Sequence, residues 1–166
     1  MYHDLGGDVA SLTGLLAHGI MKRSWLCPQN VRKPTSPAGR TRKLSVDEKS
    51  KLLQALEPKG RQNIWTKPVV VLALETAMRR SELLSLRWEN LDLVRQTALL
   101  PDTKNGSPRV VPLSTAAVEL LMSLPRNISG EVFPIKYFTL DAAFKRAVKR
   151  AGLANFHFHD LRHTAI

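Results

Sequence analysis

The segment His-Phe-His-Asp-Leu-Arg-His at residues 157–163 contains three histidines and an arginine. His159 and His163 are spaced so that two imidazoles share one face of a helix, an arrangement that can serve a zinc ion. The segment holds no Cys or Glu that could complete such a site. The single cysteine, Cys27, has no second cysteine for a disulfide or a zinc site. We therefore expect neither a metal nor another cofactor.

The charge of the chain indicates a polyanionic partner. Lys and Arg number 25 against 14 Asp and Glu, which gives a net charge of +11 and a pI near 10.3. Nucleic-acid-binding proteins carry such an excess, and so do ribosomal and membrane-surface proteins. The sequence has no apolar run of the roughly 18 residues needed to span a bilayer, and its N-terminus lacks the pattern of a secretory signal. These features favour a cytoplasmic protein that binds nucleic acid.

Basic residues are concentrated before residue 44. No acidic residue occurs between Asp8 and Asp47. Prolines keep residues 28–43 extended, which is typical both of a solvated linker and of a basic strap that lies along phosphates. The two interpretations are compatible, since a flexible basic segment can become ordered on a nucleic acid. Seven basic residues fall in the gap: Lys22, Arg23, Arg32, Lys33, Arg40, Arg42 and Lys43.

Helical spacing and capping residues predict the first two helices. Apolar residues recur at helical spacing over residues 8–26, which predicts one helix. Ser45 and Glu48 form a capping-box pattern that opens a second helix. Pro58 marks the end of that helix, because proline cannot continue it.

The apolar run Val-Val-Val-Leu-Ala-Leu that follows Pro68 fits either a strand or a buried helix. A helix is favoured because Thr66 can cap it and because proline is tolerated in a first turn. Ser81 is expected to cap a short helix, and residues 90–92 are expected to form a turn.

Two strands are predicted at residues 97–100 and 109–113. Asn105-Gly106 between them is a hairpin signal, because both residues tolerate positive φ angles. Ser114 is expected to cap a further helix, and residues 140–151 form an amphipathic helix with Gly152 at its C-terminal end. The predicted fold class is α+β, mainly α, with a small antiparallel hairpin or sheet.

Four segments, in this order, resemble the catalytic domain of tyrosine recombinases and phage integrases. They are TAMRRSELLSLRW at 76–88, TKNGSPRVVPL at 103–113, FKRAVKRAGL at 144–153 and HFHDLRH at 157–163. The resemblance implies a catalytic domain at residues 44–166 that lacks the last helices of the family. It also implies a basic linker at 28–43 and, at 1–27, the last helix of the core-binding domain that precedes the catalytic domain.

The resemblance assigns four catalytic residues: Arg79, Lys104 in the hairpin turn, and His159 and Arg162 of an H-x-x-R box. Two guanidiniums can hold the nonbridging oxygens of a DNA phosphodiester and stabilise the charge of a five-coordinate phosphorus. A lysine with a lowered pKa can protonate the leaving 5′ oxygen. A histidine can hydrogen-bond the phosphate or accept the proton of the nucleophile. This chemistry requires no metal.

Each of these residues has a plainer role when it is considered alone. Arg79 would be a helix-terminal arginine paired with Glu82 or Glu75, and Lys104 would be a solvated turn lysine. The cationic face of the amphipathic helix would be solvated, or would contact DNA phosphates. The candidates for such contacts are Lys145, Arg146, Lys149 and Arg150.

The resemblance implies site-specific recombination or integration of DNA by transesterification through a tyrosine nucleophile. In the family this tyrosine follows the H-x-x-R box, whereas the only tyrosines here are Tyr2 and Tyr137. Tyr137 precedes the box, and we interpret it as a structural residue of a loop and strand end. We therefore expect this fragment to bind double-stranded DNA, to hold a partial active site and to form no covalent DNA intermediate by itself.

The resemblance also implies partners. Full-length members form a synaptic tetramer on DNA, and this fragment is expected to be a monomer in solution, in a bacterial or phage context and associated with the nucleoid. An alternative function is a non-catalytic DNA-binding remnant or accessory protein of a recombination site. Type IB topoisomerases share the active-site logic, but the motifs here are more similar to those of integrases. RNA binding is disfavoured, because aromatic residues make up only 6% of the chain and no stacking motif occurs.

Overall fold

The computed structural model describes residues 41–58, 63–101 and 107–165. The chain divides into two compact units, Met1–Ala38 and Gly39–Ile166, and every described residue belongs to the second. The predicted helix at 8–26, most of the basic linker and the Asn105-Gly106 turn lie outside the described residues. The same holds for six of the predicted functional residues: Lys22, Arg23, Arg32, Lys33, Arg40 and Lys104.

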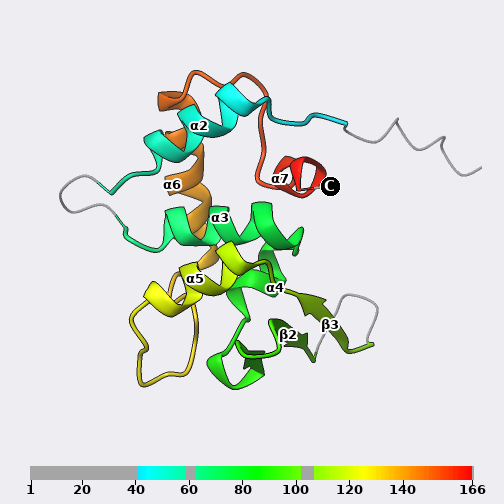
Figure 1. Cartoon of the computed structure of the whole chain (residues 1–166). Helices are drawn as coiled ribbons and strands as arrows, with labels where there is room; N and C mark the ends of the chain where they lie inside the picture. Colours follow the sequence, from blue (N-terminus) through cyan, green and yellow to red (C-terminus); the bar gives the residue numbers. More distant parts are fainter. Residues whose placement is uncertain (1–40, 59–62, 102–106, 166) are drawn as a thin grey trace, which may run out of the picture. The chain divides into compact units, whose positions relative to one another are not determined.

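The first helix, α2 (Val46–Ala55), begins with the predicted capping box (Figure 1). The Glu48 N–H donates to Ser45 Oγ at 3.2 Å, and the Ser45 N–H donates to Glu48 Oε2 at 3.0 Å. Two backbone donors that the helix leaves free are thereby satisfied. The prediction of a helix that starts from these two residues is confirmed.

The apolar run after Pro68 is helical, as predicted, and forms α3 (Thr66–Thr76). The expected cap is wrong, because Trp65 is the N-cap residue and Thr66 is the first residue of the helix. The Trp65 N–H donates to Asn63 Oδ1 at 2.8 Å, so the side chain that bonds to the backbone at the start of this helix is that of Asn63 and not that of Thr66.

Helix α3 lies at the centre of the core. Val69, Val70 and Leu72 are fully buried, so the helix has apolar side chains on several faces. It contacts α4 (Arg80–Leu84), α5 (Thr115–Ser123), α6 (Tyr137–Arg150) and α7 (Asp160–Thr164). Figure 1 shows α3 between α2 and α5. A helix that is apolar on several faces loses its periodic signature, which explains why its sequence also fitted a strand.

The start of α4 differs from the prediction. Arg79 is its N-cap residue and Ser81 lies within the helix, so Ser81 does not cap it. The carboxylate of Glu82, the third residue of the helix, accepts the N–H of the N-cap residue Arg79 at 2.7 Å.

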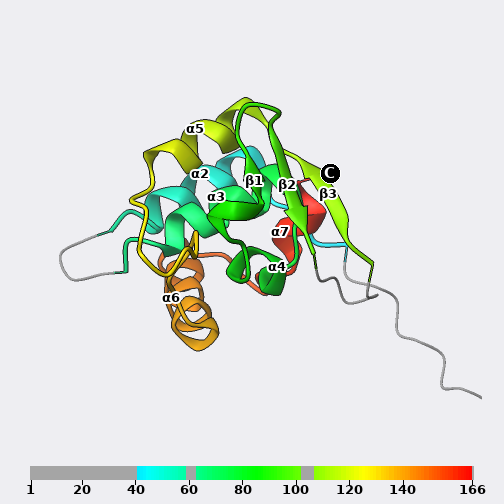
Figure 2. The ribbon, with the colours of Figure 1, turned by 90° about the horizontal axis from the view of Figure 1, so that it is seen from below.

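Three antiparallel strands follow in the order β1, β2, β3. β2 (Thr97–Leu100) and β3 (Arg109–Pro112) pair in the predicted hairpin, with Leu100 opposite Arg109. β1 (Leu91–Asp92) occupies residues for which a turn was predicted; the turn lies instead at residues 93–96. A strand of two residues has too little periodicity to be read from sequence, and its pairing with β2 defines it. Figure 2 shows β2 and β3 beside α4.

The remaining helices frame the C-terminal half of the described chain. Ser114 Oγ accepts the Ala117 N–H at 3.1 Å and caps α5 as predicted. α6 begins at Tyr137, before the predicted start at residue 140, so Tyr137 is helical and does not belong to a loop. Gly152 follows α6 with a φ of 68°.

Among the helices of the described ranges, none is both long and apolar enough to cross a bilayer. The prediction of an α+β, mainly α fold is confirmed.

Helix α3 ends at a strained residue. Ala77 has φ 52° and ψ 22°, a left-handed conformation that costs about 1–2 kcal/mol for a residue with a Cβ. We expect Ala77→Gly to raise the free energy of unfolding by about 0.5–1 kcal/mol, since glycine relieves this strain but has more freedom in the unfolded chain. Chemical denaturation measures the change. Ala73→Gly, inside the same helix, should lower it by at least about 1 kcal/mol; the same sign at both positions would refute the strain argument.

Candidate functional site

Helix α7 presents His159 and Arg162 from a buried base. His159 is the N-cap residue and Arg162 the third residue of the helix, so both lie on one side of it. Asp160 and Leu161, between them, are fully buried. Asp160 Oδ2 accepts the His157 N–H at 2.8 Å, which fixes the backbone at the start of the helix. The two predicted residues of the H-x-x-R box are therefore held in a defined position.

His159 and Arg162 line a small cavity of about 120 Å³, together with Met78, Arg80 and Phe158. Arg162 Nη1 is buried and has no hydrogen-bond partner. A buried donor without an acceptor costs roughly 1–3 kcal/mol, and more for a charged group. Arg162 thus has an unsatisfied guanidinium donor beside a cavity that its side chain helps to line. The geometry therefore suits the binding of a phosphate oxygen.

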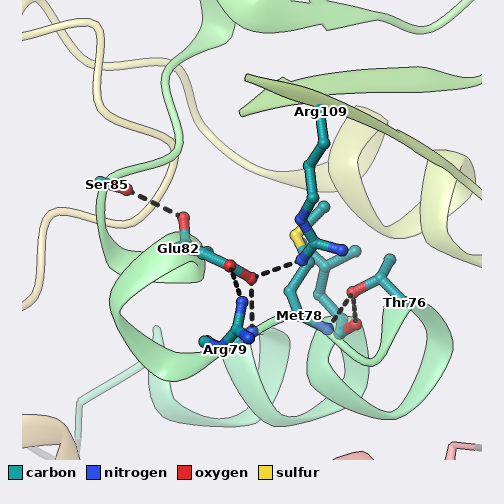
Figure 3. Close-up of polar contacts among 7 residues, drawn as sticks. Thr76, Met78, Arg79, Glu82, Ser85 and Arg109 are labelled. Carbon is teal, nitrogen blue, oxygen red and sulfur yellow. Dashed lines mark hydrogen bonds and ion pairs between the residues drawn. The ribbon is translucent and has the colours of Figure 1, made fainter. Parts of the chain in front are cut away.

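Arg79 lies at the start of α4 and is paired with Glu82 (Figure 3). Arg79 Nη1 donates to Glu82 Oε1 at 2.8 Å, and the Arg79 N–H donates to Glu82 Oε2 at 2.7 Å. Arg109, from β3, approaches the same carboxylate, and its Nη2 donates to Glu82 Oε2 at 2.7 Å. The pairing of Arg79 with Glu82 that sequence analysis gave as an alternative is thus present, and it leaves 38% of the Arg79 side chain exposed.

Glu82 is an ionised carboxylate at neutral pH. Burial, with only 4% of the residue exposed, raises its pKa, but hydrogen bonds from the Arg79 backbone and from the guanidiniums of Arg79 and Arg109 outweigh burial and lower the pKa. The cluster thus carries two positive charges and one negative charge. Glu82 was expected only as a candidate partner of Arg79, and Arg109 was not expected at the site. The position of Glu82 three residues after Arg79 was an available signal, whereas Arg109 gave none.

Arg80, and not Arg79, lines the cavity with His159 and Arg162. Its Nη1 donates to Asp141 Oδ1 at 2.6 Å, and its guanidinium lies 3.9 Å from the ring centroid of Tyr137. Its Nη2 also donates to the Tyr137 hydroxyl. The structure therefore brings His159 and Arg162 together at one cavity, while Arg79 is the chain neighbour of two of the residues that line it.

The other predicted DNA contacts lie on exposed or partly exposed surface. Arg42 forms an ion pair with Glu48, and Lys145 pairs with Asp141 at 2.8 Å. Arg150 Nη2 donates to the carbonyl of Ala55 at 2.7 Å. Among residues 41–58, 63–101 and 107–165, no group of three or more Cys, His, Asp or Glu side chains could hold a metal ion. The candidates with exposed side chains, whose role in DNA binding stays a prediction, are Lys43, Lys145, Arg146, Lys149 and Arg150.

The sequence model of the phage integrase family matches residues 42–166, three quarters of the chain. The chain belongs to the phage integrase family. This match covers the H-x-x-R box, the Arg79 segment and the hairpin, and so includes every element of the site described above. The resemblance to this family that the four motifs indicated is confirmed.

Relatives and solved structures agree with this family membership. A shufflon-specific DNA recombinase of Escherichia coli is 43% identical over 136 residues, which cover 82% of this chain and 35% of that protein. The catalytic core of lambda integrase superposes with a TM-score of 0.61 at 23% identity, covering 74% of this chain and 80% of that one. A lambda integrase tetramer bound to a Holliday junction gives a TM-score of 0.61 at 22% identity, covering 93% and 49%. The chain spans about a third of the length of the curated relatives it matches.

Proposed function

We propose that this member of the phage integrase family is the phosphate-binding part of a site-specific DNA recombinase. The reaction is a metal-free transesterification of a DNA phosphodiester. Arg79 and Arg162 bind the nonbridging oxygens, Lys104 protonates the leaving 5′ oxygen, and His159 hydrogen-bonds the phosphate or accepts the nucleophile's proton. The observation that carries the proposal is that Arg162, whose buried Nη1 has no hydrogen-bond partner, lines one cavity together with His159.

Tyr137 does not serve as the nucleophile in this proposal. Its ring and its hydroxyl both contact Arg80, and it is the first residue of α6. These contacts of Tyr137 with Arg80 also favour a second candidate function, that of a non-catalytic DNA-binding protein that occupies a recombination site. Both candidates bind duplex DNA through the same arginines. The trapping of a covalent DNA adduct at Tyr137 on a nicked substrate would contradict the assignment of Tyr137.

The proposed partner is double-stranded DNA. The net charge of +11 supports it, and a similar fold forms a tetramer on a Holliday junction in lambda integrase. In the proposal the full-length protein assembles as a tetramer on DNA at the bacterial or phage nucleoid, whereas this chain alone is a monomer. A scattering mass in the absence of DNA that matches a stable tetramer would contradict the monomer.

Arg162→Ala is expected to weaken binding to duplex DNA of about 30 base pairs by roughly tenfold. The slope of log Kd against log salt should fall by about 0.9, since one phosphate contact is lost. Fluorescence anisotropy over a salt series measures both quantities. Arg95→Ala is the matched control: Arg95 is 84% exposed and pairs loosely with Asp92 at 3.7 Å. An Arg162→Ala protein that is folded and indistinguishable from Arg95→Ala would overturn the proposed phosphate contact.

A further inference from the structure

Arg109 links the sheet to the start of α4. It is the first residue of β3 and lies opposite Leu100, the last residue of β2, at the end of the pairing where the chain passes from β2 to β3. Its Nη2 donates to Glu82 Oε2 at 2.7 Å across 27 positions of sequence. Figure 3 shows Arg109 descending from the strand while Arg79 approaches the same carboxylate from the other side.

The guanidinium of Arg109 is turned towards the protein. Nη2 binds the carboxylate, and the adjacent Nε is buried without a hydrogen-bond partner. The Nε–Nη2 edge of the fork, which in arginine is well suited to planar anions, is therefore directed at Glu82 and not at solvent. This orientation fits a side chain that holds a carboxylate better than one that reaches out to a DNA phosphate.

The carboxylate of Glu82 in turn fixes Arg79. Oε1 accepts Arg79 Nη1, while Oε2 accepts both the Arg79 N–H and Arg109 Nη2. Removal of Arg109 would leave Oε2 with one donor, the Arg79 N–H, and would take away the only one of these three hydrogen bonds that comes from outside the start of α4. One directional hydrogen bond, from Nη1 to Oε1, joins the Arg79 guanidinium to this carboxylate, so the position of Oε1 sets where Nη1 lies.

We infer that Arg109 is a positioning residue for Arg79, which it orients through the buried carboxylate of Glu82. This inference rests on the proposed function, in which Arg79 binds a DNA phosphate. Arg109 does not touch the phosphate. It holds Glu82, and Glu82 holds the guanidinium of Arg79 in the orientation that binds the phosphate oxygens.

A double-mutant cycle on Arg79 and Arg109 tests the inference. The wild-type chain, Arg79→Ala, Arg109→Gln and the double variant are titrated with the same duplex of about 30 base pairs by fluorescence anisotropy. Because both single changes remove one contact of Arg79 with phosphate, each is expected to weaken binding by about tenfold, and the double variant should bind no more than about twofold worse than either single one. Independent losses that multiply to about a hundredfold would overturn the inference, since Arg109 would then contact DNA by itself.

Two further variants distinguish the positioning role of Arg109 from the effect of its charge and from its effect on folding. Arg109→Lys keeps a donor and a positive charge on Glu82 and is expected to bind within about threefold of wild type. Arg95→Gln removes the same charge at a residue that is 84% exposed and measures the loss from net charge alone. Thermal unfolding of every variant identifies a temperature at which all of them are folded. If Arg109→Gln is unfolded at every temperature, Arg109→Lys alone tests the inference. A tenfold loss of DNA affinity in the folded Arg109→Lys protein would then overturn it.

The two proposals fail in different ways. If Arg79→Ala binds DNA as Arg95→Gln does, the proposed phosphate contact of Arg79 is wrong. If Arg79→Ala weakens binding and Arg109→Gln does not, the phosphate contact stands and the positioning role of Arg109 is wrong.

Discussion

Replacement of Glu82 by glutamine is expected to lower the free energy of unfolding by about 3 kcal/mol at neutral pH. Glu82 is 4% exposed and accepts three hydrogen bonds, from the Arg79 N–H, Arg79 Nη1 and Arg109 Nη2. Glutamine keeps one acceptor oxygen and places an NH₂ group against a guanidinium donor, so that two positive charges lose their counter-charge. The side chains of Arg79 and Arg109 are 38% and 39% exposed, and solvent screening limits the loss to this size.

Chemical denaturation of the Glu82→Gln protein measures this loss, and Glu89→Gln is the matched control. Glu89 accepts a bond from Arg87 Nε at 2.7 Å, but its side chain is 67% exposed. An exposed ion pair contributes about 0–1 kcal/mol, so the control should change stability by less than about 0.5 kcal/mol. Similar losses for the two variants would show that the Glu82 cluster does not stabilise the fold.

The effect of Glu82→Gln should depend on pH. The pKa of Glu82 in the folded protein lies below the ordinary value of 4.5, because the hydrogen bonds from Arg79 and Arg109 outweigh burial. The unfolded state therefore binds a proton at a pH where the folded state does not, and stability falls as the pH falls. The contribution of Glu82 is fully present above the ordinary carboxylate pKa and is lost as the pH falls through the lower folded value. Denaturation curves at neutral and acid pH should show the gap between wild type and Glu82→Gln closing in acid.

Phe144→Ala is expected to lower the free energy of unfolding by about 4 kcal/mol, since it empties a large core position. Phe144 is 2% exposed, and its ring centroid lies 5.1 Å from that of Phe158 and 6.1 Å from that of Phe156. Phe158 also lines the cavity of His159 and Arg162. The variant should therefore lose stability and, where it still folds, part of its affinity for DNA.

Phe138→Ala in the same helix is the control for Phe144→Ala. Phe138 is 83% exposed and contacts the ring of Tyr137 edge to face at 5.4 Å. Its removal should change the free energy of unfolding by less than about 0.5 kcal/mol. Thermal and chemical denaturation of both variants gives the comparison, and an equal loss at the two positions would contradict the burial of Phe144 in the core.

Elements defined by neighbouring residues could be predicted. The capping box of Ser45 and Glu48 and the cap at Ser114 were found because each is contained within four residues. The apolar stripe of α6 was found because its spacing repeats over several turns. The predicted start of that helix is three residues too late. Its first residue, Tyr137, contacts Arg80, which lies 57 positions away in sequence. The start of α6 thus involves a tertiary contact, whereas the apolar spacing of its interior can be recognised in the sequence alone.

For the site, the sequence by itself determined the residue types and the family. The motif that contains Arg79, and the box of His159 and Arg162, predicted the fold and the phosphate chemistry, and the match over residues 42–166 confirmed the family. Only the tertiary structure decided that Arg79 and Arg109 share the carboxylate of Glu82 and that Arg162 Nη1 is buried and unpaired. The physical reason is distance along the chain: β3 meets α4, and α7 meets the end of α3, through packing that no local pattern encodes.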